Sequence, residues 1–271
     1  MKLAYAISAS PTRFAAVAQG QDVAASIRHL ARLGYQGVEL AIRDPAMVNI
    51  DEIADVVREE GIVVPAIGTG QAYLEEGLAL TAPDPATREL AVARLEAQVP
   101  LAGRLGAFLI LGLIHGPIPP DTDRERATEW LLAGLARLSR RAAAHGVRIV
   151  IEPINRYESN WLNTVDEVMT LIGRLGADGV GVLPDTFHMN IEERDIVTAL
   201  ERARPRLWHV HVADSNRRAP GAGHLSFGAI IAHLRALDYR GAVSAEILQD
   251  PSFEIAAAHT IRVLRPLLDP E

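Results

Sequence analysis

Eight short, almost continuous apolar segments recur along the whole chain. Each segment has the length of a β-strand and is bounded by polar residues, glycine or proline. Strands that are apolar on both faces need cover on both faces, so the pattern predicts a parallel sheet enclosed by helices. The candidate strands are residues 3–8, 37–42, 62–68, 107–113, 148–152, 180–184, 207–212 and 242–247.

The segments between these strands carry apolar residues at three- and four-residue spacing, which predicts amphipathic helices. In the first of them, Asp22 is a candidate N-cap and Gly34 lies just past the end. The segment 68–77 is instead expected to be a loop that walls a pocket with Gln71 and Tyr73. The expected helices are residues 22–34, 51–61, 85–106, 126–146, 165–175, 195–203, 227–237 and 253–268.

The alternation of strands and helices predicts an α/β fold, a (β/α)₈ TIM barrel built from units of roughly 30 residues. Residues 1–271 contain no linker-like stretch, so we expect a single domain. A doubly wound open sheet is the alternative, but "SASPTRF" after the first strand lacks the glycines of a dinucleotide-binding turn. In the sixth strand, Gly179 and Gly181 are expected to mark close packing.

Composition narrows the possible partners. The formal net charge of −7 argues against a nucleic-acid surface, which needs a basic stripe. The absence of cysteine excludes disulfides and thiolate metal sites. No segment approaches about 18 uninterrupted apolar residues, so we expect no membrane span. The first residues lack the pattern of a signal peptide, and a cytoplasmic protein is expected.

Each of the last four strands ends near a potential metal ligand: Glu152, Asp185, His211 and Glu246. Because the carboxyl ends of barrel strands meet at one face, we expect these side chains to converge. Three carboxylates in one pocket would repel each other, and a divalent cation removes that difficulty. The oxygen-rich set favours Mn²⁺ or Mg²⁺, with Co²⁺ or Zn²⁺ as alternatives. Taken singly, each residue could instead be a helix cap, a core histidine or an ion-paired carboxylate.

Four motifs resemble those of the xylose isomerase-like barrels, and within them the D-tagatose 3-epimerase group of ketose 3-epimerases. They are "VIEPINRYE" (150–158), "DTFHMNIEE" (185–193), "HVADSNRRAPGAGH" (211–224) and "SAEI" (244–247). The resemblance covers essentially the whole chain. It implies one divalent metal, usually Mn²⁺, on Glu152, Asp185, His211 and Glu246. It also implies that Glu152 and Glu246 are the catalytic pair, and that substrate is contacted by Glu158, His188 and Arg217.

The resemblance implies a metal-dependent sugar epimerase that acts next to a ketone through a cis-enediolate. "AIGTGQAYLEEGLALT" (66–81) is similar to the bacterial 5-keto-L-gluconate epimerases. Arg156, Arg217 and Arg218 would supply cations, which favours a keto-sugar acid such as 5-keto-L-gluconate. A free ketose and a sugar phosphate stay open as substrates. The family also implies a homo-oligomer, either a dimer or a tetramer.

Other functions fit parts of the same pattern. An aldose–ketose isomerase or a lyase would begin with the same proton abstraction, and a non-catalytic sugar-binding protein is also conceivable. Abasic-site endonucleases share this barrel but use a multi-zinc cluster with extra histidines. Here the third strand ends in "GTG" without a histidine, and His115 after the fourth strand is the only spare candidate.

Overall fold

A computed structural model of the chain describes residues 1–19 and 22–269. All recorded strand pairings are parallel, and the sheet runs in the order β7-β6-β5-β4-β3-β1-β9-β8, with the two-residue β2 beside β1. The eight predicted strands are therefore confirmed. The strands are β1 Lys2–Ser8, β2 Ala18–Gln19, β3 Gly37–Ala41, β4 Ala66–Gly68, β5 Phe108–Leu111, β6 Ile149–Ile151, β7 Val180–Val182, β8 Val210–Val212 and β9 Ala242–Ala245.

The sheet closes on itself between β7 and β8. Two parallel bridges, Val182 with Leu207 and Asp185 with His211, join the ends of the strand order. The backbone N–H of Trp208 donates to Val182 O at 3.3 Å, and that of His211 donates to Pro184 O at 2.9 Å. Closure gives the (β/α)₈ TIM barrel that the sequence predicts, and no open sheet edge remains at this seam.

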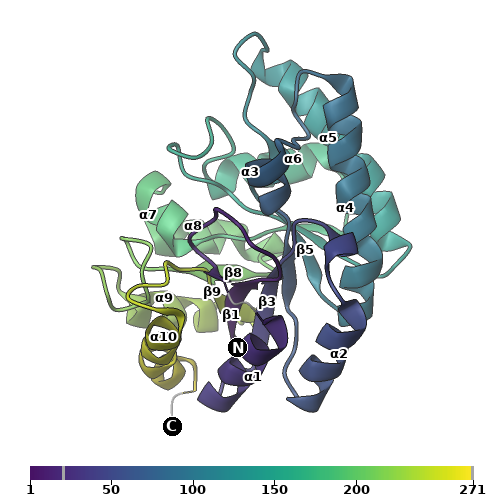
Figure 1. Cartoon of the computed structure of the whole chain (residues 1–271). Helices are drawn as coiled ribbons and strands as arrows, with labels where there is room; N and C mark the ends of the chain where they lie inside the picture. Colours follow the sequence, from purple (N-terminus) through teal and green to yellow (C-terminus); the bar gives the residue numbers. More distant parts are fainter. Residues whose placement is uncertain (20–21, 270–271) are drawn as a thin grey trace.

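Helices surround the strands, as Figure 1 shows. Each expected helix is present within a few residues of its predicted bounds. Two helices were not expected, namely α3, which replaces part of the predicted loop 68–77, and α7, which begins right after Asp185. No helix in the described part of the chain has the length and apolar character that a membrane span requires. The helices are α1 Val23–Leu33, α2 Ile50–Glu59, α3 Gln71–Glu76, α4 Pro85–Leu105, α5 Arg124–Ala143, α6 Val165–Leu175, α7 Thr186–Glu192, α8 Ile196–Ala203, α9 Phe227–Ala236 and α10 Phe253–Leu268, with 3₁₀ turns at Pro45–Met47, Leu113–His115 and Arg204–Arg206.

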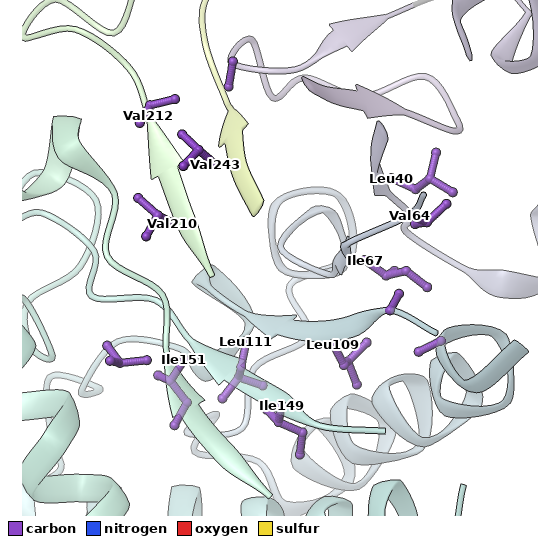
Figure 2. Packing of buried hydrophobic residues seen from close by; sticks show 14 of the residues in the cluster. Leu40, Val64, Ile67, Leu109, Leu111, Ile149, Ile151, Val210, Val212 and Val243 are labelled. Atoms are coloured by element: carbon purple, nitrogen blue, oxygen red, sulfur yellow. The ribbon is translucent and has the colours of Figure 1, made fainter. Parts of the chain in front are cut away.

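Alternate residues of each strand belong to two different layers of the core. Ile149 and Ile151 of β6 belong to the large cluster between strands and helices, and Figure 2 shows them with the matching residues of β5. Val150, between them, belongs to a small inner cluster with Ala66, Ile110 and Leu183. Because strand side chains alternate between the two faces, the residue two positions after an inner residue also points inward.

Gly181 of β7 is required where β7 meets the segment before β8. A Cβ atom at this position would lie 2.5 Å from the Trp208 ring and 2.7 Å from the backbone oxygen of Arg206. At Gly179, by contrast, an added Cβ atom would meet nothing within 4 Å. The expectation of close packing therefore holds for Gly181 and is wrong for Gly179.

We expect Gly181→Ala to lower the free energy of unfolding by about 1–3 kcal/mol, because a backbone oxygen cannot move away cheaply. The matched variant Gly179→Ala should change it by less than about 0.5 kcal/mol. Chemical denaturation of both variants beside the wild type measures the two effects. Equal stabilities of the two variants would contradict this account of barrel closure.

Candidate active site

The four candidate ligands converge at the carboxyl ends of the strands. Glu152 lies two residues after Val150, and Asp185 lies two residues after Leu183, so both continue the inner face of the barrel. His211 is on β8, and Glu246 follows β9 directly. One ligand atom from each of these residues lies within 4.8 Å of the others. Strand register thus brings together four residues that are far apart in the sequence.

The cluster has the properties of a cation site. Glu152 Oε1, Asp185 Oδ2 and His211 Nδ1 are buried and have no hydrogen-bond partner. His211 Nδ1 lies 3.3 Å from Glu152 Oε1 and 3.9 Å from Glu246 Oε2. Buried polar atoms without partners are costly, and one divalent cation would satisfy all three at once. The donor set of three carboxylates and one imidazole fits such an ion.

Burial also changes the proton affinity of this cluster. It raises the pKa of Asp185 to about 6, and the charge of Glu152 adds to the effect. Burial raises the pKa of Glu246 to about 8, again with a contribution from Glu152. Burial alone would lower the pKa of His211, but the carboxylates of Glu39, Glu152 and Glu246 raise it well above its ordinary value. Near neutral pH, the metal-free cluster therefore holds protons that a cation must displace.

His188 presents an N–H group to the four candidate ligands. Asn155 Oδ1 accepts the N–H of Tyr157 at 2.9 Å, which directs Asn155 Nδ2 toward His188 Nδ1 at 2.7 Å and Glu158 Oε1 at 2.8 Å. Because Nδ1 of His188 accepts, its Nε2 carries the proton. Nε2 lies 3.9 Å from Glu152 Oε1. Burial lowers the pKa of His188 well below its ordinary value, so the ring is a neutral donor.

Arg217 links the candidate ligand Glu246 to Glu158. Its Nη1 donates to Glu158 Oε1 at 2.7 Å, and its Nη2 lies 3.4 Å from Glu246 Oε2. The guanidinium also lies over the rings of Phe14 and Phe187, at 5.2 and 4.9 Å from their centroids. Such contacts on several sides fix the orientation of the cation. Glu158, His188 and Arg217 are thus brought together beside the four candidate ligands.

A cavity that is partly open to solvent lies beside the cluster, and Glu152, His211 and Glu246 line it. Its lining also includes apolar side chains, among them Phe14, Leu74 and Leu113, and Gln71 of α3. Tyr73, which was predicted to line the pocket with Gln71, is not one of the described residues that line the cavity. Arg217 is the sole arginine or lysine among those residues.

Two of the three predicted cations lie elsewhere. Arg156 forms an exposed ion pair with Glu192 at 2.8 Å, and Arg218 pairs with Asp250 at 2.8 Å. Their inclusion in the pocket was wrong because the loop that carries each arginine directs its side chain to a carboxylate outside the cavity.

The multi-zinc alternative requires further histidine ligands beside the four candidate ligands. His115 Nδ1 lies 2.7 Å from the backbone oxygen of Gly116, and burial lowers the pKa of His115 to about 4. His115 belongs to neither group of potential ligands in the described residues. The second group consists of Glu39, His209 and His211. Glu39 and His209 were not singled out from the sequence, although a glutamate inside an apolar strand and a histidine two residues before His211 are visible there.

We expect the protein to bind about one divalent cation per chain and to release about one proton or more per ion at pH 7. The raised pKa values of Asp185 and Glu246 mean that protons compete with the metal at low pH. Affinity should therefore rise as the pH increases from about 6 to about 8. Titration calorimetry with Mn²⁺ in buffers of different ionisation enthalpy measures this release. A pH-independent affinity without proton release would contradict the arrangement, and three ions per chain would favour the multi-zinc alternative.

Known proteins similar to this chain include named sugar epimerases. An L-ribulose 3-epimerase from Mesorhizobium japonicum is 32% identical over 215 residues, which cover 79% of this chain and 71% of that protein. A 3-dehydro-D-guloside 4-epimerase from Escherichia coli is 30% identical over 241 residues, covering 83% and 87%.

The fold is similar to that of solved structures, and a family model matches most of the chain. The crystal structure of a D-psicose 3-epimerase with D-tagatose, from Clostridium cellulolyticum H10, has a TM-score of 0.85 at 24% identity, covering 99% of this chain and 100% of that one. At this identity the likeness shows the fold. A model of the family described as xylose isomerase-like TIM barrel matches residues 27–267. The chain belongs to the xylose isomerase-like TIM barrel family.

Proposed function

We propose that the protein is a divalent-metal-dependent ketose 3-epimerase. The observation that carries the proposal is the convergence of Glu152, Asp185, His211 and Glu246 beneath a cavity that His188 and Arg217 also line. Relatives that are named 3-epimerases of ribulose and psicose support it. Among the possible ions, Mn²⁺ suits the oxygen-rich set best.

Epimerisation needs a proton removed from the carbon next to the ketone and returned to the opposite face. A bound divalent cation would supply Lewis-acid stabilisation of the charge that develops on the oxygens. Glu152 follows β6 and Glu246 follows β9, so β7 and β8 separate them around the barrel. We assign these two carboxylates as base and acid, with roles that exchange when the reaction reverses. Asp185 and His211 would serve only to hold the cation.

The remaining polar groups orient the sugar. The Nε2–H of His188 and the guanidinium of Arg217 can donate to oxygens near the ketone, where negative charge develops. Glu158 accepts from Asn155 and from Arg217 and has lone-pair capacity left for a sugar hydroxyl. Asn155 contacts both His188 and Glu158, so it keeps two substrate contacts in one geometry.

The charges around the cavity favour a neutral ketose as the substrate. Four carboxylates, those of Glu152, Glu158, Asp185 and Glu246, lie at or beside the cavity, against one guanidinium. A divalent cation would still leave this region without surplus positive charge. Because Arg156 and Arg218 pair with carboxylates elsewhere, the charge argument for a keto-sugar acid such as 5-keto-L-gluconate rests on Arg217 alone.

With Mn²⁺ present, we expect a higher kcat/KM for free ketoses than for keto-sugar acids or ketose phosphates of the same carbon number. An anionic group would enter a region that carries no spare cation. Product analysis by chromatography or NMR compares the three substrate classes and separates C3 epimers from C4 epimers and aldoses. Preference for a keto acid would contradict the charge argument. A C4 epimer or an aldose product would favour the 4-epimerase or isomerase alternative.

We expect Glu152→Gln and Glu246→Gln each to reduce kcat by at least ~10²-fold, because an amide cannot shuttle the proton. In D₂O, the wild type should incorporate deuterium at the epimerised carbon. The matched control Glu125→Gln, an exposed residue paired with Arg174, should retain full activity. Circular dichroism checks that all three variants fold. Near-wild-type turnover of either active-site variant would contradict its assignment, and absence of deuterium would exclude the enediolate route.

A further inference from the structure

A buried carboxylate lies behind His211, on the side away from the candidate cation site. Glu39 is in the middle of β3 and is 2% exposed, while its neighbours Val38 and Leu40 belong to the outer layer of the core. By alternation, Glu39 points into the barrel. The proton-transfer steps described above make no use of this residue.

Two imidazoles contact the Glu39 carboxylate. Its Oε2 lies 2.8 Å from His209 Nε2, and both of its oxygens lie 3.0 Å from His211 Nε2. These are ordinary N–H···O distances. His209 and His211 are two residues apart on β8, so both point inward and reach the same carboxylate. A buried carboxylate needs such donors, because it has lost its hydration.

The contact with Glu39 decides which nitrogen of His211 is free. If Nε2 donates to Glu39, the Nδ1 lone pair of the neutral ring is available as a ligand. That same Nδ1 is the buried atom without a hydrogen-bond partner, and it faces Glu152 and Glu246. Nε2 of His211 thus contacts Glu39, and Nδ1 faces the candidate cation site.

We propose that Glu39 is a positioning residue that holds His211 in the tautomer and orientation needed to bind the divalent cation through Nδ1. His209 orients Glu39 from the other side. The inference rests on the proposed metal site and deepens it. A carboxylate on the far nitrogen of a ligating histidine fixes the ring and makes it a more basic ligand, and loss of such a partner typically weakens metal binding by ~10- to 100-fold.

The three residues could alternatively form a second cation site, since their ligand atoms also lie within 4.8 Å of one another. The hydrogen-bonded arrangement is favoured because it gives each nitrogen of His211 a partner: Nε2 donates to Glu39, and Nδ1 is left to bind the cation. It therefore requires one ion per chain. A second strongly bound ion would overturn the proposal.

The first test compares Mn²⁺ affinity of Glu39→Gln with that of Glu158→Gln, by calorimetry and by the EPR signal of free Mn²⁺. Both variants remove one negative charge from the barrel, but Glu158 contacts Asn155 and Arg217 rather than His211. We expect Glu39→Gln to weaken binding by ~10- to 100-fold and Glu158→Gln to weaken it only a few-fold. Equal effects, or an unchanged affinity in Glu39→Gln, would overturn the proposal.

The second test needs no variant, so it holds even if Glu39→Gln fails to fold. In wild-type protein with ¹⁵N-labelled histidine and bound Zn²⁺, long-range ¹H–¹⁵N correlations should show His211 protonated at Nε2 and metal-bound at Nδ1. The reverse assignment would overturn the inference. Wild-type protein that binds no divalent ion at all would instead refute the proposed function, so the two failures are distinguishable.

Discussion

The contact on which the candidate site depends is the closure of the barrel between β7 and β8. The N–H of His211 donates to Pro184 O, which places His211 directly beside Asp185. This contact also sets the position of His209, and with it the environment of Glu39. Gly181 makes the approach possible, because any larger residue would collide with Trp208 and the backbone of Arg206. A strand-pairing contact thus sets the relative positions of the candidate ligands, and a defect in packing at β7 would disturb the candidate cation site.

The site concentrates charge where the barrel would otherwise be apolar. Three carboxylates share a region of low polarity, and burial raises the pKa of Asp185 and Glu246. The rest of the fold offsets this cost at specific points: Arg217 faces Glu246, and His209 and His211 face Glu39. Bound metal would offset more of it, so we expect the ion to stabilise the folded chain as well as to support the chemistry. Arrangements that store such a cost are typical of functional sites.

Much of this arrangement follows from the sequence. Continuous apolar runs predict the strands, and the polar residues that end the last four runs predict the convergence of Glu152, Asp185, His211 and Glu246. Glu39 was predictable by the same reasoning, because a glutamate in an apolar strand needs a buried partner, but attention to strand ends alone passes over it. Helix α3, with six residues, is too short for helical periodicity to stand out. The directions of Arg156 and Arg218 depend on loop conformation and on partners distant in sequence, which residue spacing does not encode.

On the proposed function, proton transfer and sugar selection would depend largely on different parts of the molecule. The groups proposed for proton transfer and metal binding lie at or near strand ends, whose positions the closed barrel fixes. The cavity wall is made by segments beyond the strands: Phe14 in the β1–β2 connection, Leu74 on α3, and Arg217 in the loop after β8. We infer that the segments around Phe14 and Leu74 can vary with little effect on the candidate ligands, whereas Arg217 is constrained by its contact with Glu246. Exchange of these loop residues between relatives should alter substrate preference, whereas changes at Glu39 or Gly181 should alter the metal site or the fold for every substrate alike.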